Sequence, residues 1–351
     1  MAYTTINNPE LFFQTKLYTG NGSAQSFTLD GSENMQPDWV WIKPRSFADN
    51  HILVDSVRGT NKILRSNLAN AESTLTTMLT SFDSDGFTTG GNDNVTRNSE
   101  TFVAWNWKAG TTGSGTTTGS GTGKAYSYSV NTTAGFSIVK YIGNGTSGHT
   151  IPHHLGAVPK WFLVKNLDNT GGWAWRVYHA SLGETKRIFL DTTAVADTDS
   201  TAWNDTAPTS SVFTLGNSTG TNSNDENFIA YCFSEKQGYS KFGSYTGNGN
   251  SDGTFVYTGF RPAWLMVKAS SATSAWYIYD NKRVGYNPDN NQLYSDRNNA
   301  EDTTDQVDLL SNGFKWKATT GDPNSSGRTY IYMAFSESSF VNSSSVPNNA
   351  R

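Results

Sequence analysis

The sequence predicts an all-β protein of three tandem β-sandwich units in the jelly-roll or lectin-like style, each about 95 residues long. Two observations lead to this fold class. First, the composition favours sheets joined by turns, since 13% of the 351 residues are aromatic, only 16% are charged, and Thr, Asn and Gly are abundant. Second, a set of short motifs recurs three times in the same order along the chain.

The composition also excludes several classes of protein. Disordered chains combine high charge with few aromatic residues, and coiled coils need long periodic runs of Ala, Glu, Lys and Leu. A net charge of -4 argues against a nucleic-acid partner, because such proteins need Lys and Arg for the phosphates. No stretch approaches 18 apolar residues, so we expect no membrane insertion. The N-terminus lacks the pattern of a signal peptide, which indicates synthesis in a cytoplasm.

The repeated motifs keep a nearly constant spacing. Tyr-x-Gly-Asn-Gly is followed 17 to 19 residues after its Tyr by Pro-x-Trp-x-x-x-Lys. An aromatic-x-Ala-aromatic segment comes about 60 residues later, at 102–105, 228–231 and 332–335, and a Gly-Phe or its equivalent precedes it. We therefore interpret the chain as three copies of one unit. The landmark residues are Tyr18, Trp39 and Lys43, then Tyr141, Trp161 and Lys165, then Tyr245, Trp264 and Lys268.

Each motif predicts an element. The apolar runs 39–42, 161–164 and 264–267 follow a Pro, which a strand tolerates at its first position, and they predict buried strands. The segments that contain Ala predict further strands, with Ala where the opposite sheet comes close. Asn and Gly in Tyr-x-Gly-Asn-Gly accept positive φ and predict tight turns. Apolar residues at helical spacing predict one short helix over 70–82.

These elements divide the chain into six segments. We expect an N-terminal docking segment at 1–15, unit 1 at 16–108, a Gly/Ser/Thr linker and lead-in at 109–134, unit 2 at 135–236, unit 3 at 237–340 and a C-terminal tail at 341–351. The start of the linker has no apolar anchor beyond Ala109, so it should be flexible. Units 2 and 3 should then lie close together, with unit 1 hinged more freely. Segment 1–15 is equally consistent with an extra strand on unit 1.

The side chains that could bind a metal each have a structural alternative. His149, His153 and His154 lie within six residues, but Pro152 interrupts their spacing, and we favour a polar turn that leads into a strand. The loop carboxylates do not follow the order of a calcium loop. We therefore predict no metal and no cofactor. Cys232, the single cysteine, should be a small buried apolar residue.

The sequence offers no catalytic motif. It has no Gly-x-Ser-x-Gly elbow, no Cys/His pair and no phosphate-binding Gly-x-x-x-x-Gly-Lys. A pair of opposed carboxylates, as in glycosidases, stays possible because Asp and Glu are plentiful. We predict no catalytic residues and a protein that is not an enzyme.

Aromatic residues outside the landmarks are the candidate ligand-binding residues. Exposed Trp and Tyr beside Asn and Asp suit sugar rings, and the same side chains serve protein interfaces. Packing in the core is the main alternative for each of them. The candidates are Trp173, Trp203, Trp276, Tyr279, Tyr286 and Tyr294.

Several stretches resemble a known family. They are residues 1–9 with 13–20, residues 242–264, and Tyr-Ile-Tyr-Met-Ala-Phe-Ser-Glu at 330–337. They resemble the repeated-domain virion proteins of tailed, mainly marine, bacteriophages, and the resemblance spans nearly the whole chain. Members of that family are labelled tail, fibre or structural proteins, and no catalytic residues come with it. The resemblance implies a component of the virion that is made in the host cytoplasm and released by lysis.

From this resemblance we expect a virion structural protein, a tail fibre or tail-tip protein that attaches to the host surface without catalysis. Its expected partners are copies of itself, in a homotrimer, other virion proteins, and a host surface glycan or protein. An alternative is a capsid decoration or tail-accessory protein that binds other virion proteins. A further alternative is a polysaccharide-degrading enzyme of the tailspike type.

Overall fold

The computed structural model describes residues 3–168, 172–283, 287, 290–317 and 323–347. Strands make up 45% of the structure and helices 5%, and the named strand pairs are antiparallel. The predicted all-β class is therefore confirmed. Six of the seven sheets in the described residues fall into three pairs, one in each predicted unit, and each pair has a larger and a smaller sheet.

Unit 1 contains a larger sheet in the order β1-β9-β3-β4 and a smaller sheet in the order β2-β8-β7. A two-stranded sheet, β5-β6, lies beside them. The bounds are η1 (Pro9–Leu11), β1 (Phe13–Thr19), β2 (Gln25–Thr28), β3 (Trp39–Pro44), β4 (Ile52–Asp55), β5 (Lys62–Ile63), β6 (Ser73–Thr74), β7 (Leu79–Asp83), β8 (Gly86–Thr89), α1 (Asp93–Thr96) and β9 (Thr101–Trp107).

Unit 2 has the same pair of sheets, with additions. The larger sheet has the order β10-β12-β13-β20-β15-β16-β17-β18, and the smaller has the order β11-β14-β19. The bounds are β10 (Thr111–Thr116), β11 (Thr118–Gly119), β12 (Ala125–Asn131), β13 (Phe136–Ile142), β14 (His149–Pro152), β15 (Pro159–Asn166), β16 (Arg176–His179), β17 (Lys186–Phe189), β18 (Asp197–Thr198), α2 (Ser200–Trp203), β19 (Val212–Leu215), α3 (Thr219–Asn222) and β20 (Asn227–Ser234).

Unit 3 follows the plan of unit 1. Its larger sheet has the order β21-β28-β23-β24-β25 and its smaller sheet the order β22-β27-β26. The bounds are β21 (Ser240–Thr246), β22 (Phe255–Tyr257), β23 (Phe260–Ala269), β24 (Trp276–Asp280), β25 (Leu293–Tyr294), β26 (Val307–Leu310), β27 (Gly313–Trp316) and β28 (Thr329–Ser339).

The landmark residues occupy equivalent places in these sheets, which supports the interpretation of the chain as a repeat. Trp39, Trp161 and Trp264 start the apolar part of β3, β15 and β23, and they face Trp107, Phe233 and Phe335 on the next strand. The pairing corrects one alignment. Because Ile42 and Val164 face Ala104 and Ala230 whereas Val267 faces Tyr332, the strand segment of unit 3 that matches 102–105 is 330–333 and not 332–335.

The Tyr-x-Gly-Asn-Gly turns are held in the same way in each unit. The Tyr hydroxyl donates to a backbone carbonyl: Tyr18 to Val95 (2.8 Å), Tyr141 to Thr221 (2.6 Å) and Tyr245 to Pro323 (2.8 Å). The last Gly of each motif has a φ of 65° to 73°, the left-handed region that favours glycine. The turns that the sequence predicts are therefore present, and each is anchored through its Tyr.

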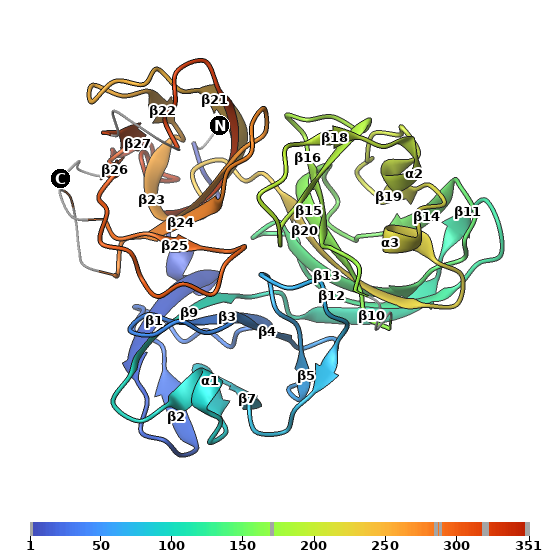
Figure 1. The fold of residues 1–351 in the computed structure, drawn as a ribbon, viewed down its shortest axis with the longest axis horizontal. Helices are drawn as coiled ribbons and strands as arrows, with labels where there is room; N and C mark the ends of the chain where they lie inside the picture. Colours follow the sequence, from blue (N-terminus) through green and yellow to red (C-terminus); the bar gives the residue numbers. More distant parts are fainter. Residues whose placement is uncertain (1–2, 169–171, 284–286, 288–289, 318–322, 348–351) are drawn as a thin grey trace.

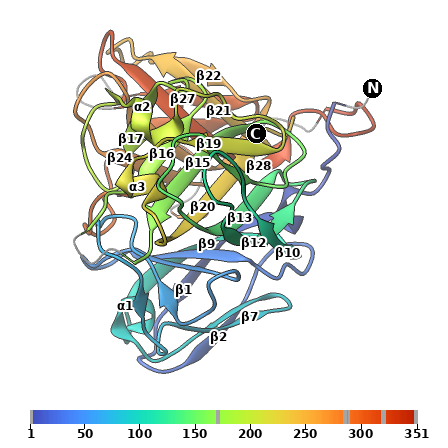
Figure 2. The ribbon, with the colours of Figure 1, turned by 90° about the vertical axis from the view of Figure 1, so that its right-hand side faces the viewer.

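The three pairs of sheets surround a common centre, with the larger sheets inside and the smaller sheets at the periphery (Figure 1). One apolar cluster draws residues from all three units. Aromatic pairs join every two units: Trp39 with Tyr231 (ring centroids 4.4 Å apart), Trp107 with Trp264 (5.5 Å) and Trp161 with Trp276 (5.6 Å). Figure 2 shows the small sheet of unit 1 (β2, β7) and that of unit 3 (β22, β27) at opposite ends of the molecule.

Three predictions about flexible or helical segments are wrong. The expected linker contains β10, which pairs with β12 and extends the larger sheet of unit 2, and β11, which pairs with β14. Its glycines permit this pairing, because a Cβ at Gly113 would lie 2.6 Å from the Tyr128 hydroxyl. Unit 1 is not hinged freely either, since it shares the central cluster. The helix expected over 70–82 is absent, and β6 and the start of β7 occupy that range.

The N-terminal segment contacts two units. From Phe13 onward it forms β1, which pairs with β9, so the extra-strand alternative holds for its last residues. Further upstream, the Tyr3 hydroxyl lies 3.3 Å from that of Tyr257 and donates to the Gly259 carbonyl (3.0 Å) in unit 3. The segment thus ties unit 1 to unit 3.

Candidate binding surface

The candidate ligand-binding aromatics are mostly buried. Trp203, Trp276 and Tyr279 are at most 1% exposed and Tyr294 is 9% exposed, so these rings are core residues and offer no face to a ligand in this structure. Trp173 is half-buried, with the Arg176 guanidinium 5.9 Å from its ring centroid. Tyr286 lies outside the described residues. For these four side chains the alternative of packing in the core holds, and most of the residues that bury them come from distant parts of the chain.

The histidines of unit 2 form structural hydrogen bonds. His149 is buried in β14, where its two ring nitrogens lie 2.8 Å from Asn222 Oδ1 and 2.7 Å from Thr117 Oγ1. His154 stacks on Tyr128, with centroids 3.7 Å apart. Burial lowers the pKa of His153 to about 4. Within the described ranges no three His, Cys, Asp or Glu side chains are grouped to hold a metal ion. The buried Cys232 packs in the core of unit 2.

The landmark lysines hold the units together. Each is fully buried and donates to a backbone carbonyl of a neighbouring unit: Lys43 to Asn298 (3.3 Å), Lys165 to Ala69 (2.6 Å) and Lys268 to Thr193 (3.0 Å). Unit 1 thus reaches unit 3, unit 2 reaches unit 1, and unit 3 reaches unit 2, which closes a ring. Burial lowers the pKa of Lys43 to about 7 and that of Lys165 to about 8.

Next to each lysine, a ring nitrogen of a Trp or His side chain lies within hydrogen-bond distance of a second backbone carbonyl of the same neighbouring unit. Trp175 Nε1 donates to the Arg65 carbonyl (2.9 Å) and Trp276 Nε1 to the Phe189 carbonyl (2.8 Å). At the equivalent place in unit 1, His51 Nε2 lies 2.7 Å from the Tyr294 carbonyl oxygen, while its Nδ1 accepts from Trp41. In each case the acceptor lies four residues before the one used by the lysine. We call each lysine, its ring partner and the segment they bind a clasp; the segments are 65–69, 189–193 and 294–298.

Buried ion pairs reinforce two of the three junctions. Arg58 donates to Asp55 (2.5 Å), which also accepts from Tyr231 of unit 2 (2.6 Å). Arg283 donates to Asp280 (2.7 Å), which accepts from Trp105 of unit 1 (2.9 Å). Such pairs are weak evidence for stability, but breaking one leaves a buried charge uncompensated.

The third junction, between units 2 and 3, has a neutral residue at the same position. His179 Nε2 lies 3.2 Å from the Tyr332 carbonyl oxygen, and its Nδ1 accepts from the Ser181 amide. Burial lowers the pKa of His179 to about 4, so the ring is neutral near pH 7.

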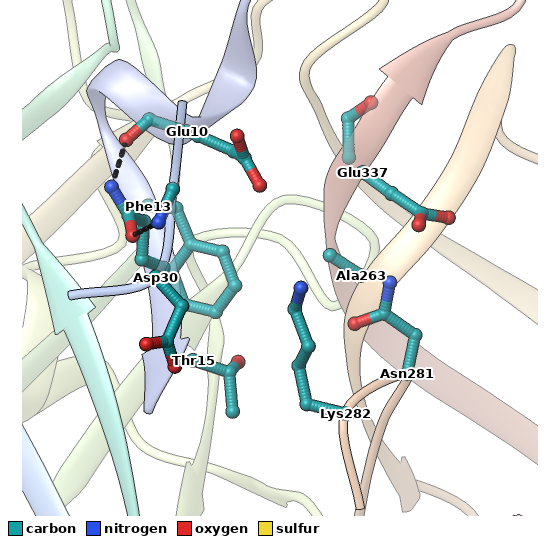
Figure 3. Close-up of a pocket in the computed structure, with 11 residues that line it drawn as sticks. Glu10, Phe13, Thr15, Asp30, Ala263, Asn281, Lys282 and Glu337 are labelled. Atoms are coloured by element: carbon teal, nitrogen blue, oxygen red, sulfur yellow. Dashed lines mark hydrogen bonds between the residues drawn. The ribbon is translucent and has the colours of Figure 1, made fainter. Parts of the chain in front are cut away.

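A small cavity lies between units 1 and 3 (Figure 3). Its volume of about 30 Å³ suits one or two water molecules and is too small for a sugar ring. Gln14 closes one side by donating to the Glu10 carbonyl (2.8 Å) and accepting from the Gly31 amide (2.8 Å). The figure labels Glu10 together with Phe13, Thr15, Asp30, Ala263, Asn281, Lys282 and Glu337. We assign this cavity to the junction between the units.

The outer strands of the smaller sheets differ between the units. Phe27 in β2, Ile151 in β14 and Val256 in β22 are equivalent, since each is buried and faces a Phe on the next strand. The residues beside them point outward. In unit 1 these residues are Ser26 and Thr28, which are exposed. In unit 2 they are Thr150 and Pro152, which are partly buried, and strand β11 pairs with β14 at this edge.

Unit 3 alone exposes aromatic side chains at these positions. Phe255 is 45% exposed and Tyr257 is 53% exposed, and they are two of the few large apolar side chains on the described surface. We call β22 with these two side chains the β22 edge. The sequence alone did not predict this edge, because Phe-Val-Tyr is typical of a buried strand. Only the alignment with β2 and β14 shows that the side chains of Phe255 and Tyr257 face outward.

These features define the class: an all-β protein in which three pairs of sheets close around a shared aromatic core and, in the part of the chain that the structure describes, the β22 edge exposes two aromatic side chains. The chain matches the family described as "Domain of unknown function (DUF7483)" over residues 8–339, and it belongs to that family. Searches of curated proteins and of solved structures each gave no significant match. In the described part of the chain, no helix is both long and apolar enough to cross a membrane.

Proposed function

We propose that this chain is a non-catalytic structural and binding protein of a bacteriophage virion, located at the tail, where it contributes to attachment to the host surface. The observation that carries the binding role is the divergence of unit 3. The equivalent outer strands differ: β2 exposes polar side chains, β14 is covered by β11, and β22 exposes two aromatic side chains. Exposed aromatic residues are enriched at protein interfaces.

The clasps support a structural role. They fix three pairs of sheets in one body, so the β22 edge is presented on a rigid support. The resemblance of residues 242–264 and 330–337 to virion proteins supplies the phage context for the proposal.

One observation favours a second candidate, a capsid decoration or tail-accessory protein. The units lie side by side around a centre, as three subunits of a ring would, and they are not stacked end to end as in a fibre shaft (Figure 1). A compact body of this kind suits a docking place on a particle surface.

The test is a cryo-EM map of the virion with this chain traced in it. The tail proposal predicts a low copy number at the tail end, with unit 3 directed outward. A high copy number on the head would support the decoration alternative. Absence of the chain from the purified particle would contradict both.

A glycan array and a host-cell binding assay test the attachment role. Binding to a host surface molecule that is lost in a Phe255→Ser/Tyr257→Ser variant is the expected result. Turnover of host polysaccharide by the pure protein would instead favour the enzyme alternative.

A further inference from the structure

The β22 edge has backbone groups that face away from its own sheet. Trp316 donates its amide to the Thr254 carbonyl (3.2 Å) and Thr258 donates to the Asn312 carbonyl (3.0 Å), so residues 254 and 258 turn their peptide groups toward β27. Because these groups alternate along an antiparallel strand, those of Phe255 and Tyr257 point outward. Among the described residues β22 pairs with β27 alone.

The equivalent edge in unit 2 is occupied. There β11 pairs with β14, with Thr118 opposite Thr150 and their hydroxyls 2.8 Å apart. The fold therefore accepts an added antiparallel strand at this position, and the strand that it accepts in unit 2 is extended and uncharged.

The chain also shows which kind of strand suits an aromatic-x-aromatic edge. In unit 2, β10 lies beside β12 with Gly113 opposite Tyr128 and Gly115 opposite Tyr126. The Tyr rings cover these glycines, because a Cβ would lie 2.6 Å or 2.8 Å from a Tyr hydroxyl. Phe255 and Tyr257 repeat the aromatic-x-aromatic spacing of β12, so they suit a Gly-x-Gly strand.

Charge is consistent with the same kind of partner. Lys315 of the neighbouring strand β27 pairs with Asp252, and Lys317, directly after that strand, pairs with Asp305 and Asp308 (3.2 Å to the latter). The surface beside β22 is therefore close to neutral, which complements a segment without charges.

We propose that the β22 edge binds an extended, uncharged Gly/Ser/Thr-rich strand of a neighbouring polypeptide by β-strand addition. Outward peptide groups would supply main-chain hydrogen bonds, and the two rings would lie over the glycines. This inference deepens the proposed function and rests on it, since it names the chemistry of the partner at the exposed edge of unit 3.

A peptide with the sequence of residues 111–122 serves as the probe. Added to the isotope-labelled full-length protein, it should shift the NMR signals of the Phe255 and Tyr257 amides and slow their hydrogen exchange. Tyr257→Pro removes one outward donor that β27 does not use, and an edge strand tolerates Pro. Because Pro also lacks the Tyr ring, we expect at least about tenfold weaker binding, which is the effect of losing one hydrogen bond.

Two further variants make the test specific. Phe255→Ser/Tyr257→Ser keeps the backbone and copies the polar edge of unit 1, and it should also weaken binding about tenfold. Thr28→Pro at the matching place in β2 should leave binding unchanged. No shift at β22 with millimolar peptide, equal binding by all variants, or shifts caused by neutral oligosaccharides and not by the peptide would overturn the inference.

The outcome is separable from that of the proposed function. If the wild type and the double variant occupy virions equally and the peptide does not bind, the β-strand addition is wrong while the virion role stands. If the peptide binds but the chain is absent from virions, the virion role is wrong and the edge still binds strands of this chemistry.

Discussion

Lys43 is fully buried and donates to three backbone carbonyl groups, those of Pro44, Asp49 and Asn298. Burial opposes its charge, and this lowers the pKa to about 7 although the carboxylate of Asp49 raises it in part. In the unfolded chain a lysine has a pKa of about 10.4. The clasp therefore contains a group whose protonation depends on folding.

The low pKa of Lys43 makes the stability of the fold depend on pH. Between pH 7 and about 10.4 the unfolded chain holds a proton that the folded chain has released, so the free energy of unfolding rises with pH. Relative to Lys43→Met, the wild type should gain on the order of 3 kcal/mol from pH 7 to 10. Urea unfolding at several pH values measures this. Parallel curves for the two proteins would contradict it.

Trp276 gives a second residue-scale prediction. Trp276→Phe leaves the Phe189 carbonyl without its indole donor, whereas Trp316→Phe removes an equally buried indole that has no hydrogen-bond partner among the described residues. The two substitutions lose similar apolar area. The first should therefore reduce the free energy of unfolding by about 1–3 kcal/mol more than the second. Equal losses in chemical denaturation would show that the clasp hydrogen bond contributes nothing.

The same residue shows the limit of prediction from sequence. The repeats identified Trp39, Trp161 and Trp264 as strand residues, and the structure places them in β3, β15 and β23. Trp276 is a candidate for ligand contact from its residue type and its polar neighbours in the sequence, and no local pattern predicts its hydrogen-bond acceptor, which lies 87 residues earlier in another unit. Contacts between units depend on how the strands assemble, and a motif within one unit does not predict them.

At the scale of elements, β10 is the main departure from expectation. A Gly/Ser/Thr segment buries little apolar surface, so composition predicts a flexible linker. The structure orders it through backbone pairing with β12 and through the Tyr rings over its glycines. Composition alone cannot predict this, because the stabilising side chains belong to the partner strand.

Hydrogen exchange tests this assignment. The amides of residues 111–116 that bond to β12 should exchange at least about tenfold more slowly than in an unfolded peptide, since opening must break the pairing. Gly113→Val should remove this protection, because its side chain would collide with Tyr128. The same substitution at Gly110, where a Cβ meets nothing within 4 Å although φ is 119°, is a control for backbone strain alone. Immediate exchange in the wild type would restore the linker interpretation.

At the scale of the whole molecule, the three clasps and the central cluster make the units interdependent. Each smaller core belongs to one unit, but the largest cluster takes residues from all three. The sequence predicted the sheet class and the repeated turns correctly. It did not predict how the units are arranged. Separate hinged units and a closed ring of units would contain the same motifs, and the two arrangements differ only in the contacts between units.

The clasps also explain why the landmark lysines recur. A lysine that ends a buried strand is costly unless its amine finds acceptors. Each of these amines donates to a backbone carbonyl of the neighbouring unit, so a unit on its own would lack one acceptor for its buried lysine. We therefore expect that residues 1–108 alone do not fold stably, which circular dichroism of that fragment would check.

Calorimetry of the full-length chain tests whether the three pairs of sheets unfold as one body. A shared core and a closed ring of clasps predict a single transition whose calorimetric and van't Hoff enthalpies agree. Trp161 lies in the apolar cluster that all three units share, so Trp161→Ala should lower the Tm of the whole transition. Two or three resolved transitions, with only one of them moved by Trp161→Ala, would contradict the claim and show that the units fold independently.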